Sequence, residues 1–292
     1  MKNVKVLAVW EVIIATLFLG ANGTFVQLVS LSAELILFFR ALLAFLVLFF
    51  VVLFSRHAFR LKSRGDYLRV FLLGIFMTIN WLFFFYAIKV STVAVGMIAV
   101  FTFPIMTTFL EPYFVKEKIA KRDVISAIFM FAGVLFLMPE FSLENDVTLG
   151  IVFGLVSSLA YAFRNIFSKK MLQTYSSTVL MCYQAVIMVI FMLPFVFYAE
   201  SIIFAENDIW YLLFLGVLGT ALGHTLFVKS MRHLSARKAS VITSAQPVYG
   251  TLLAFFVLNE VPTLKVIIGG LIIVVVVTFE ALKHKTKDVL LD

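Results

Sequence analysis

Long apolar stretches, separated by short polar segments, fill almost the whole chain. A transmembrane helix needs about 17 to 25 mostly apolar residues, and ten stretches come close to that length. They cover residues 6–29, 35–54, 69–88, 92–115, 124–138, 149–168, 177–198, 209–229, 238–258 and 264–282. Because lipid offers no hydrogen-bond partners to the backbone, each stretch is expected to be a helix. The pattern predicts an all-α polytopic membrane protein with ten transmembrane helices.

The overall composition favours the same class. The chain has 292 residues, of which 63% are hydrophobic, and 34 are phenylalanines, whereas about half the residues of a soluble domain are apolar. Lys2 and Lys5 precede the first apolar stretch, as in a secretory signal peptide. The nine later stretches favour an uncleaved first helix instead.

The charged residues alternate between the loops. With the N-terminus in the cytoplasm, all but three of the 24 Lys and Arg residues fall on the cytoplasmic side, the exceptions being Arg40, Lys89 and Lys265. The positive-inside rule therefore predicts that both termini are cytoplasmic, and we expect the membrane to be a bacterial inner (plasma) membrane. The net charge of +8 reports this orientation and does not indicate a nucleic-acid partner. The opposite loops carry Glu34, Glu140, Glu144, Asp146, Glu200, Glu206, Asp208 and Glu260.

The second half of the chain repeats the first half at a spacing of 143 residues. This shift places Pro104 on Pro247, Thr108 on Thr251, Leu110 on Leu253 and Glu117 on Glu260. Because five spans is an odd number, the second unit is expected to cross the membrane upside down relative to the first. The predicted units are residues 6–138 and 149–282, followed by a cytoplasmic tail, 283–292.

Several motifs carry a family resemblance across the whole chain. They are a first helix with Trp10 and small residues, Arg40 in the second helix, the segment YAIKVSTVAVGMIAVFTFPI, and a proline-to-glutamate signature ending each fourth helix. Together they resemble the EamA-type, ten-helix transporters of the drug/metabolite transporter superfamily. The resemblance implies a central cavity lined mainly by helices 1, 3, 4, 6, 8 and 9, with helices 5 and 10 peripheral. It implies no particular substrate, because the family handles amino acids, nucleotide derivatives, cofactors and drugs.

Two prolines mark candidate binding regions in the fourth and ninth stretches. Pro104 and Pro247 each remove one backbone hydrogen bond near the middle of a span, and polar residues precede them: Thr102 in one repeat, Thr243 and Gln246 in the other. Inverted-repeat transporters tend to bind substrates or coupling ions at such interruptions. The alternatives are a kink that only shapes the helix and, for Gln246, a hydrogen bond that only joins two helices.

Other candidates for a substrate or coupling-ion site lie on the first, third and eighth stretches. Glu11, in the segment WEVIIAT, resembles the carboxylate of the small multidrug resistance transporters and is a candidate proton site; its alternative is water contact or pairing with Lys5. Asn80 and Trp81 occupy positions equivalent to Gly223 and His224 in the other repeat. His224 is either a proton relay or a packing residue, and Trp81 with Tyr86 either forms an aromatic wall or packs.

Arg40 and Arg164 are candidate contacts for an anionic substrate group. The alternatives are snorkelling to the membrane surface or a structural ion pair. Glu111 is expected to snorkel, whereas Glu117 and Glu260 are expected to organise loops at helix ends.

Glycines are expected to allow close backbone approach in two helices. They are Gly150 and Gly154 in the sixth stretch, and Gly216, Gly219 and Gly223 in the eighth. In the last stretch, Gly269 and Gly270 suit contact with either lipid or a second copy of the chain, so a homodimer stays open.

The sequence argues against enzymatic and ATP-driven functions. It has no glycine-rich loop followed by lysine for phosphate binding. Its four histidines, His57, His224, His233 and His284, lack metal-ligand spacing, and its single cysteine, Cys182, excludes disulfides. We therefore expect no catalytic residues, no metal and no cofactor.

The sequence thus predicts a secondary active transporter that moves a small organic metabolite, such as an amino acid or a drug-like amphiphile, by alternating access. Its expected partners are that small molecule and the lipid bilayer. Export is favoured on resemblance. An uptake or exchange carrier, for example for a nucleotide-like cofactor, and a passive small-solute channel remain as alternatives.

Overall fold

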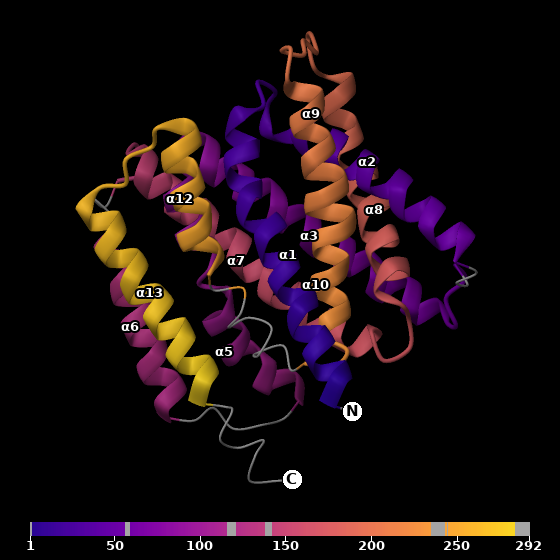
Figure 1. Ribbon diagram of the computed structural model, residues 1–292, viewed down its shortest axis with the longest axis horizontal. Coiled ribbons are helices and arrows are strands. Elements are labelled where there is room, and N and C mark those ends of the chain that lie inside the picture. The colour runs from indigo at the N-terminus through magenta and orange to yellow at the C-terminus, as the bar shows by residue number, and fades with distance from the viewer. Residues whose placement is uncertain are drawn as a thin grey trace.

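The computed structural model describes residues 2–55, 59–115, 121–137, 142–234, 243 and 245–283. All regular structure in this part is helical (Figure 1). Glu117, Glu140 and the tail beyond Lys283 lie outside the described residues. The helices are α1 (Lys2–Leu28), α2 (Ala33–Phe54), α3 (Arg64–Val90), α4 (Val93–Val100), α5 (Phe103–Val115), α6 (Lys121–Leu137), α7 (Asp146–Met171), α8 (Ser177–Phe197), α9 (Asp208–Leu213), the π-helix η1 (Phe214–His224), α10 (Thr225–Ser230), α12 (Gln246–Leu258) and α13 (Leu264–Lys283).

Membrane-spanning character is plain from the helix lengths. Among the described residues, seven segments are long and apolar enough to cross a bilayer, and two shorter apolar helices cover Gln246–Leu258 and Leu264–Val276. The chain is therefore a multi-pass membrane protein. The total of ten spans stays a prediction.

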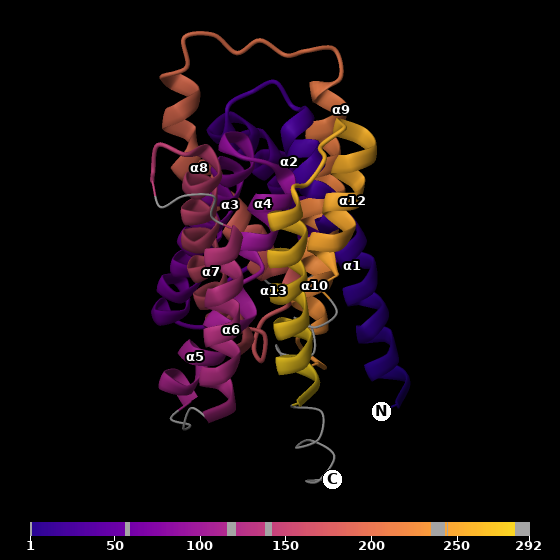
Figure 2. The ribbon, with the colours of Figure 1, turned by 90° about the vertical axis from the view of Figure 1, so that its left-hand side faces the viewer.

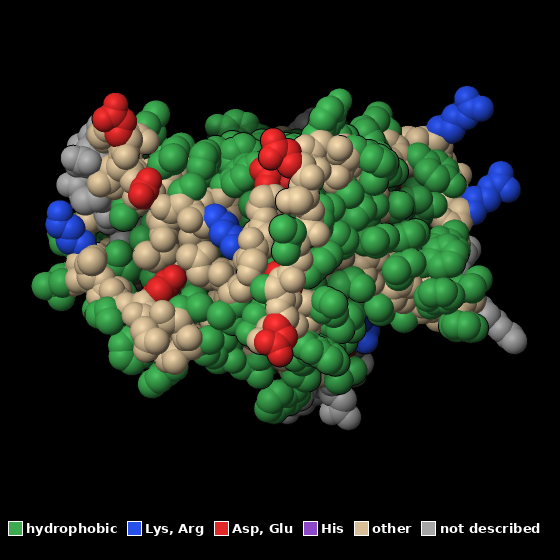
Figure 3. Space-filling view, turned by 90° about the horizontal axis from the view of Figure 1, so that it is seen from above, with side chains coloured by type: hydrophobic (Ala, Val, Ile, Leu, Met, Phe, Trp, Pro, Cys, Tyr) green, Lys and Arg blue, Asp and Glu red, His purple; other side chains and the backbone are tan. Residues whose placement is uncertain are grey.

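The helices form one elongated bundle with two distinct ends. Helix α1 begins and α13 ends at the same end, which we call the terminal side, and the opposite end is the distal side (Figures 1 and 2). Viewed from the distal side, the surface shows scattered acidic side chains among hydrophobic ones (Figure 3).

Polar residues at the ends of the loops begin several helices. The side chains of Ser63, Thr92 and Ser176 accept hydrogen bonds from backbone N–H groups in the first turns of α3, α4 and α8, at 3.2, 3.2 and 3.3 Å. Asn145 does the same for α7, at 3.0 and 3.1 Å. Such caps satisfy N–H groups that the helix itself leaves unpaired, so these polar residues fix where each helix begins.

The two-repeat architecture appears in the helix boundaries. Adding 143 to the bounds of α1, α2, α3 and α6 gives, within three residues, the bounds of α7, α8, the continuous segment α9–η1–α10, and α13. Two of these helices also pack against their own equivalents: α2 against α8, and α6 against α13. The last pair lies side by side in both ribbon views (Figures 1 and 2). An approximate two-fold axis therefore relates the repeats.

The fourth span of the first repeat is interrupted before Pro104, as its sequence predicts. Helix α4 ends at Val100 and α5 begins at Phe103. Thr102 Oγ1 in the gap hydrogen-bonds to the Ala99 carbonyl and to Ser158 Oγ on α7, both at 2.8 Å. The interruption is thus held by polar contacts inside the bundle, where lipid could supply none.

In the second repeat, α12 begins at the equivalent point. Its first residue is Gln246, and Pro247 lies in its first turn, where a missing N–H costs nothing. Both repeats therefore start a short helix at the same relative position.

The π-helix η1 was not predicted from the sequence, which indicates an ordinary helix over 209–229. Thr220 Oγ1 donates to the Leu215 carbonyl at 2.8 Å, within a segment of eleven residues. Gly216 packs on Leu43 of α2, and Gly219 packs on the side chain of Asn22 of α1. The glycines permit this close contact, and π-helices are frequent at functional sites.

Two glycines at the expected contacts lie inside the bundle. A side chain at Gly154 would overlap Ala99 of α4, and one at Gly270 would meet Ile98, also on α4. The close approach of α7 to α4 therefore depends on Gly154. Gly270 serves a contact within the chain.

We expect Gly154→Ala to lower the midpoint of thermal unfolding by several degrees in detergent, because overpacking a tight contact costs about 1–3 kcal/mol. The matched control is Gly65→Ala, since the nearest atom to an added methyl there is Ser63 Oγ, 3.8 Å away. Equal midpoints for the two variants would show that α7 and α4 separate easily.

Candidate substrate-binding site

Two repeat-equivalent residues meet in the interior of the bundle. The rings of Trp81, on α3, and His224, at the end of η1, have centroids 5.0 Å apart and planes at 86°. The shift of 143 residues relates them. The repeats run in opposite directions through the bundle. Two equivalent residues that touch must therefore lie near the two-fold axis, about halfway between the terminal and distal sides. Their contact therefore lies near this axis, at about the middle height of the bundle.

A small cavity lies at this contact. Its volume is about 30 Å³, which holds one or two water molecules and excludes anything as large as an amino acid. The cavity is therefore too small to hold a metabolite in this conformation. The lining residues are Leu19, Asn80, Trp81, Phe84, Met97, Val100, Phe101, Tyr161, His224 and Gln246.

Four of the residues singled out in the sequence share this cavity: Asn80, Trp81, His224 and Gln246. They come from α3, η1 and α12, and all four are buried. The sequence analysis did not single out Tyr161 of α7. It is one of nine tyrosines, and nothing in its neighbourhood distinguishes it from a packing residue.

The remaining candidates do not line the cavity. Thr102 and Thr243 are buried beside the two interruptions, and Pro104 lies within α5. Pro247 instead borders an apolar groove of about 260 Å³ formed largely by α12 and α13. The interruptions thus contribute Val100, Phe101 and Gln246 to the cavity, whereas the prolines and threonines beside them do not line it.

Asn80 has a structural partner. Its Nδ2 donates to Ser157 Oγ at 2.8 Å and to the Ser157 carbonyl at 3.2 Å, while Ser157 Oγ donates to the Asn80 carbonyl at 2.7 Å. This reciprocal contact joins α3 to α7, so the Asn80 amide helps to hold the wall of the cavity.

Arg40 lies directly behind this wall. Its guanidinium carbon is 3.5 Å from the centre of the Trp81 ring and 5.4 Å from that of Phe85. Its Nε donates to Thr220 Oγ1 at 2.5 Å. The side chain is fully buried, so the alternative of snorkelling to the membrane surface is wrong. Stacking on an indole face stabilises such a cation.

Arg164 is the second fully buried arginine, and for it, too, the snorkelling alternative is wrong. Its Nε donates to Gln184 Oε1 at 2.7 Å, and its Nη2 lies 3.2 Å from Met181 Sδ on α8. Its guanidinium carbon is 5.8 Å from the ring centre of Tyr161, a cavity residue. The positive charges of both arginines act on His224.

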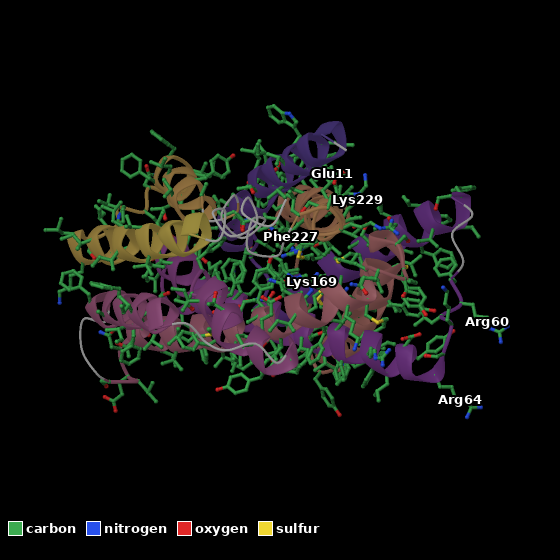
Figure 4. All side chains as sticks on the ribbon, turned by 90° about the horizontal axis from the view of Figure 1, so that it is seen from below. Glu11, Arg60, Arg64, Lys169, Phe227 and Lys229 are labelled. Atoms are coloured by element: carbon green, nitrogen blue, oxygen red, sulfur yellow. The ribbon has the colours of Figure 1, made fainter. Side chains whose placement is uncertain are left out.

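Two ion pairs join helices on the terminal side of the bundle. Glu11 of α1 pairs with Lys229 of α10 at 2.7 Å, and the two lie beside each other when seen from below (Figure 4). Glu111 of α5 pairs with Lys169 of α7 at 3.2 Å. Glu11 is therefore part of a contact between helices and does not line the central cavity. Glu111 is likewise held by a partner helix.

The distal side is closed by a different set of contacts. Glu260 Oε2, beyond the end of α12, accepts from the backbone N–H of Val93 at the start of α4, at 3.1 Å. Lys89 donates to the Val29 carbonyl at 2.7 Å, and Tyr86 donates to Glu34 and so does not join an aromatic wall at the cavity. Burial raises the pKa of Glu260, although the Val93 N–H partly offsets this. Glu260 thus organises a helix end, as expected.

Comparison with known proteins identifies the family. The pattern of the EamA-like transporter family matches residues 6–138 and again residues 148–280, which confirms the resemblance seen in the motifs. The uncharacterised transporter YxxF of Bacillus subtilis is 26% identical, over 83% of this chain and 79% of that protein. YwfM of the same organism is 27% identical over 85% of both chains.

A solved structure shows the same fold. A protein of known crystal structure with 15% sequence identity superimposes with a TM-score of 0.69, covering 96% of this chain and 98% of that one. Its low identity supports the fold alone. With the two family matches and the apolar helices, the chain belongs to the EamA-like transporter family and is an integral membrane transporter.

Proposed function

We propose that this protein is a secondary active transporter that moves a small organic metabolite by alternating access. The observation that carries the proposal is the small cavity near the approximate two-fold axis, where Trp81 meets His224. In inverted-repeat transporters, a site on such an axis can open to either side when one repeat rocks against the other.

The contacts at the two ends supply the elements that must open in turn. On the terminal side, Glu11–Lys229 joins α1 to α10, and Lys169–Glu111 joins α7 to α5. On the distal side, Glu260 joins the end of α12 to the start of α4. Each contact joins segments that would separate if the repeats moved, so release of one set exposes the cavity to one side only.

A passive channel is the competing function. A channel needs a continuous polar path, whereas the cavity at Trp81 and His224 has a volume of only about 30 Å³ and is lined largely by apolar side chains. The structure therefore favours a carrier. Export of the substrate rests on the family resemblance.

The distribution of charge supports a bacterial plasma membrane with the terminal side in the cytoplasm. Helix α2 begins beside Asp208 of the distal side, so we assign Arg60 and Arg64, which follow its other end, to the terminal side. Both project from the edge of the bundle when it is seen from below, and Lys169 is also visible there (Figure 4). Glu206 and Asp208 lie at the distal side, where α9 begins. Cytoplasmic loops carry an excess of Lys and Arg.

Cysteine labelling tests this orientation. Cys182 is buried and is first replaced by alanine. In intact cells, we expect a membrane-impermeant maleimide to label Glu206→Cys and not Arg60→Cys, because both positions are exposed but lie on opposite sides. After the cells are broken, both variants should react. The reverse pattern would invert the topology.

Counterflow in proteoliposomes tests the carrier function. Vesicles are loaded with pools of amino acids, nucleosides, organic acids or lipophilic cations, and uptake of the same labelled compounds is measured. A carrier should show saturable uptake that is accelerated by substrate on the opposite side. Uptake that neither saturates nor accelerates would indicate a channel.

For any compound that exchanges, we expect Gln246→Ala to reduce turnover about two- to tenfold, the value of one neutral hydrogen bond. Gln246 lines the cavity. Asn207→Ala is the control, because Asn207 is exposed before α9 and its side chain forms no capping hydrogen bond, so it should not change turnover. Normal exchange by a correctly folded Gln246→Ala protein would remove Gln246 from the site.

A further inference from the structure

The interior of the bundle holds two positive charges without a neutralising partner. Arg40 and Arg164 are fully buried, and neither forms a salt bridge within the described part of the chain. An arginine keeps its charge when buried, and a buried charge without a partner is costly. The two buried arginines therefore lower the stability of the bundle unless a ligand neutralises them.

The buried carboxylates of the described residues are engaged elsewhere. Glu11 pairs with Lys229 at 2.7 Å, and Asp66 pairs with Arg69 at 2.8 Å. Asp208 accepts hydrogen bonds from backbone N–H groups of the distal loops, at 3.0 and 2.9 Å. All three lie near the ends of helices, so none of them can neutralise the central arginines without leaving its own partner.

Arg40 presents the hydrogen-bonding geometry that an oxyanion requires. Its Nε is held by Thr220 and its plane stacks on Trp81, which fixes the orientation of the guanidinium group. Its Nη1 and Nη2 are buried and have no hydrogen-bond partner among the described residues. Two parallel N–H donors in one plane match the two oxygens of a carboxylate or phosphate.

Further unpartnered polar groups lie in the same part of the bundle. Trp81 Nε1, both ring nitrogens of His224 and the side-chain amide of Asn22 are buried, again without a partner in the part of the chain that is described. Trp81 contacts Arg40 and His224, and Asn22 packs on Gly219, next to Thr220. We call these five residues, Asn22, Arg40, Trp81, Thr220 and His224, the arginine cluster.

The repeat gives a second indication. Adding 143 to Asn22 gives Asn165, which is also buried with an unpartnered side-chain oxygen and is next in sequence to Arg164. Each repeat therefore places an asparagine at the same position, and each buries an arginine of its own. Arg164 has two contacts on α8, whereas Arg40 has both terminal nitrogens free for a ligand.

We infer that the arginine cluster binds the oxyanion group, a carboxylate or a phosphate, of a small metabolite, and that the transported substrate is therefore an organic anion. This inference rests on the proposed carrier function and assigns its substrate class. The anion supplies the negative charge that would neutralise Arg40. Trp81 and His224 belong both to the cluster and to the lining of the central cavity.

Thermal unfolding of the purified full-length protein tests anion binding without transport. Lactate, succinate, benzoate and glycerol phosphate are titrated against their uncharged counterparts, lactamide, succinamide, benzamide and glycerol, at constant ionic strength. At least one acid should raise the unfolding midpoint saturably while its counterpart does not. The acid that succeeds distinguishes a carboxylate from a phosphate ligand. No stabilisation by any of the four acids would overturn the inference.

Two substitutions assign the effect to Arg40. Arg40→Lys keeps the charge but loses the paired donors, so the half-saturating anion concentration should rise about 10- to 100-fold. Arg40→Met should lose the anion response and unfold at a higher temperature than the empty wild type, because a buried charge has been removed. Arg64→Met, at an exposed arginine, should respond like the wild type. An unchanged anion response in Arg40→Met would overturn the inference.

Counterflow separates this inference from the carrier function. Exchange of uncharged or cationic compounds, with no binding or exchange of acids, would leave the carrier and remove the anion site. Binding of acids without exchange of any pool would leave the anion site and remove the carrier function.

Discussion

Inside a bilayer, a polar group finds partners only within the protein, and this constraint explains most of the structure. It requires helices, and it requires that each break in a helix be repaired by nearby side chains. Thr102, between α4 and α5, hydrogen-bonds to Ser158 of α7. Asn80 of α3 hydrogen-bonds to the neighbouring Ser157. Groups that stay unpaired under this constraint, above all the terminal nitrogens of Arg40, therefore carry information about what else enters the bundle.

The inverted repeat organises these contacts around one axis, and the differences between the repeats define the site. Equivalent helices pack in pairs, such as α2 with α8, yet the residues that meet at the axis are a tryptophan and a histidine. The two buried arginines also come from non-equivalent helices, α2 and α7. Equivalent helices allow the two repeats to move in the same way. Different residues at the axis, in contrast, can bind an asymmetric ligand in one orientation.

The helices and their repeat can be predicted well from the sequence, because the length and spacing of the hydrophobic stretches determine them. The interruption before Pro104, the start of α12 at Gln246 and the repeat spacing all follow from residues that can be read one by one. The burial of Arg40 could not be predicted, since an arginine near a helix end can equally reach the surface. The partner of Glu11, Lys229, lies 218 positions away in the sequence, so the ion pair could not be predicted. The equivalence of Asn22 and Asn165 in the two repeats is found only when the repeat shift is applied to every polar residue.

The π-helix η1 adds a mechanical property to the eighth span. A π-helix holds more residues in each turn than an α-helix, because its hydrogen bonds reach one residue further. Conversion of η1 to α-helical bonding would therefore lengthen the segment between Asp208 and Ser230 and rotate everything after it, including His224. That change would alter the contact between the imidazole and Trp81. Because His224 lines the central cavity, the length of this helical segment and the shape of the cavity are linked.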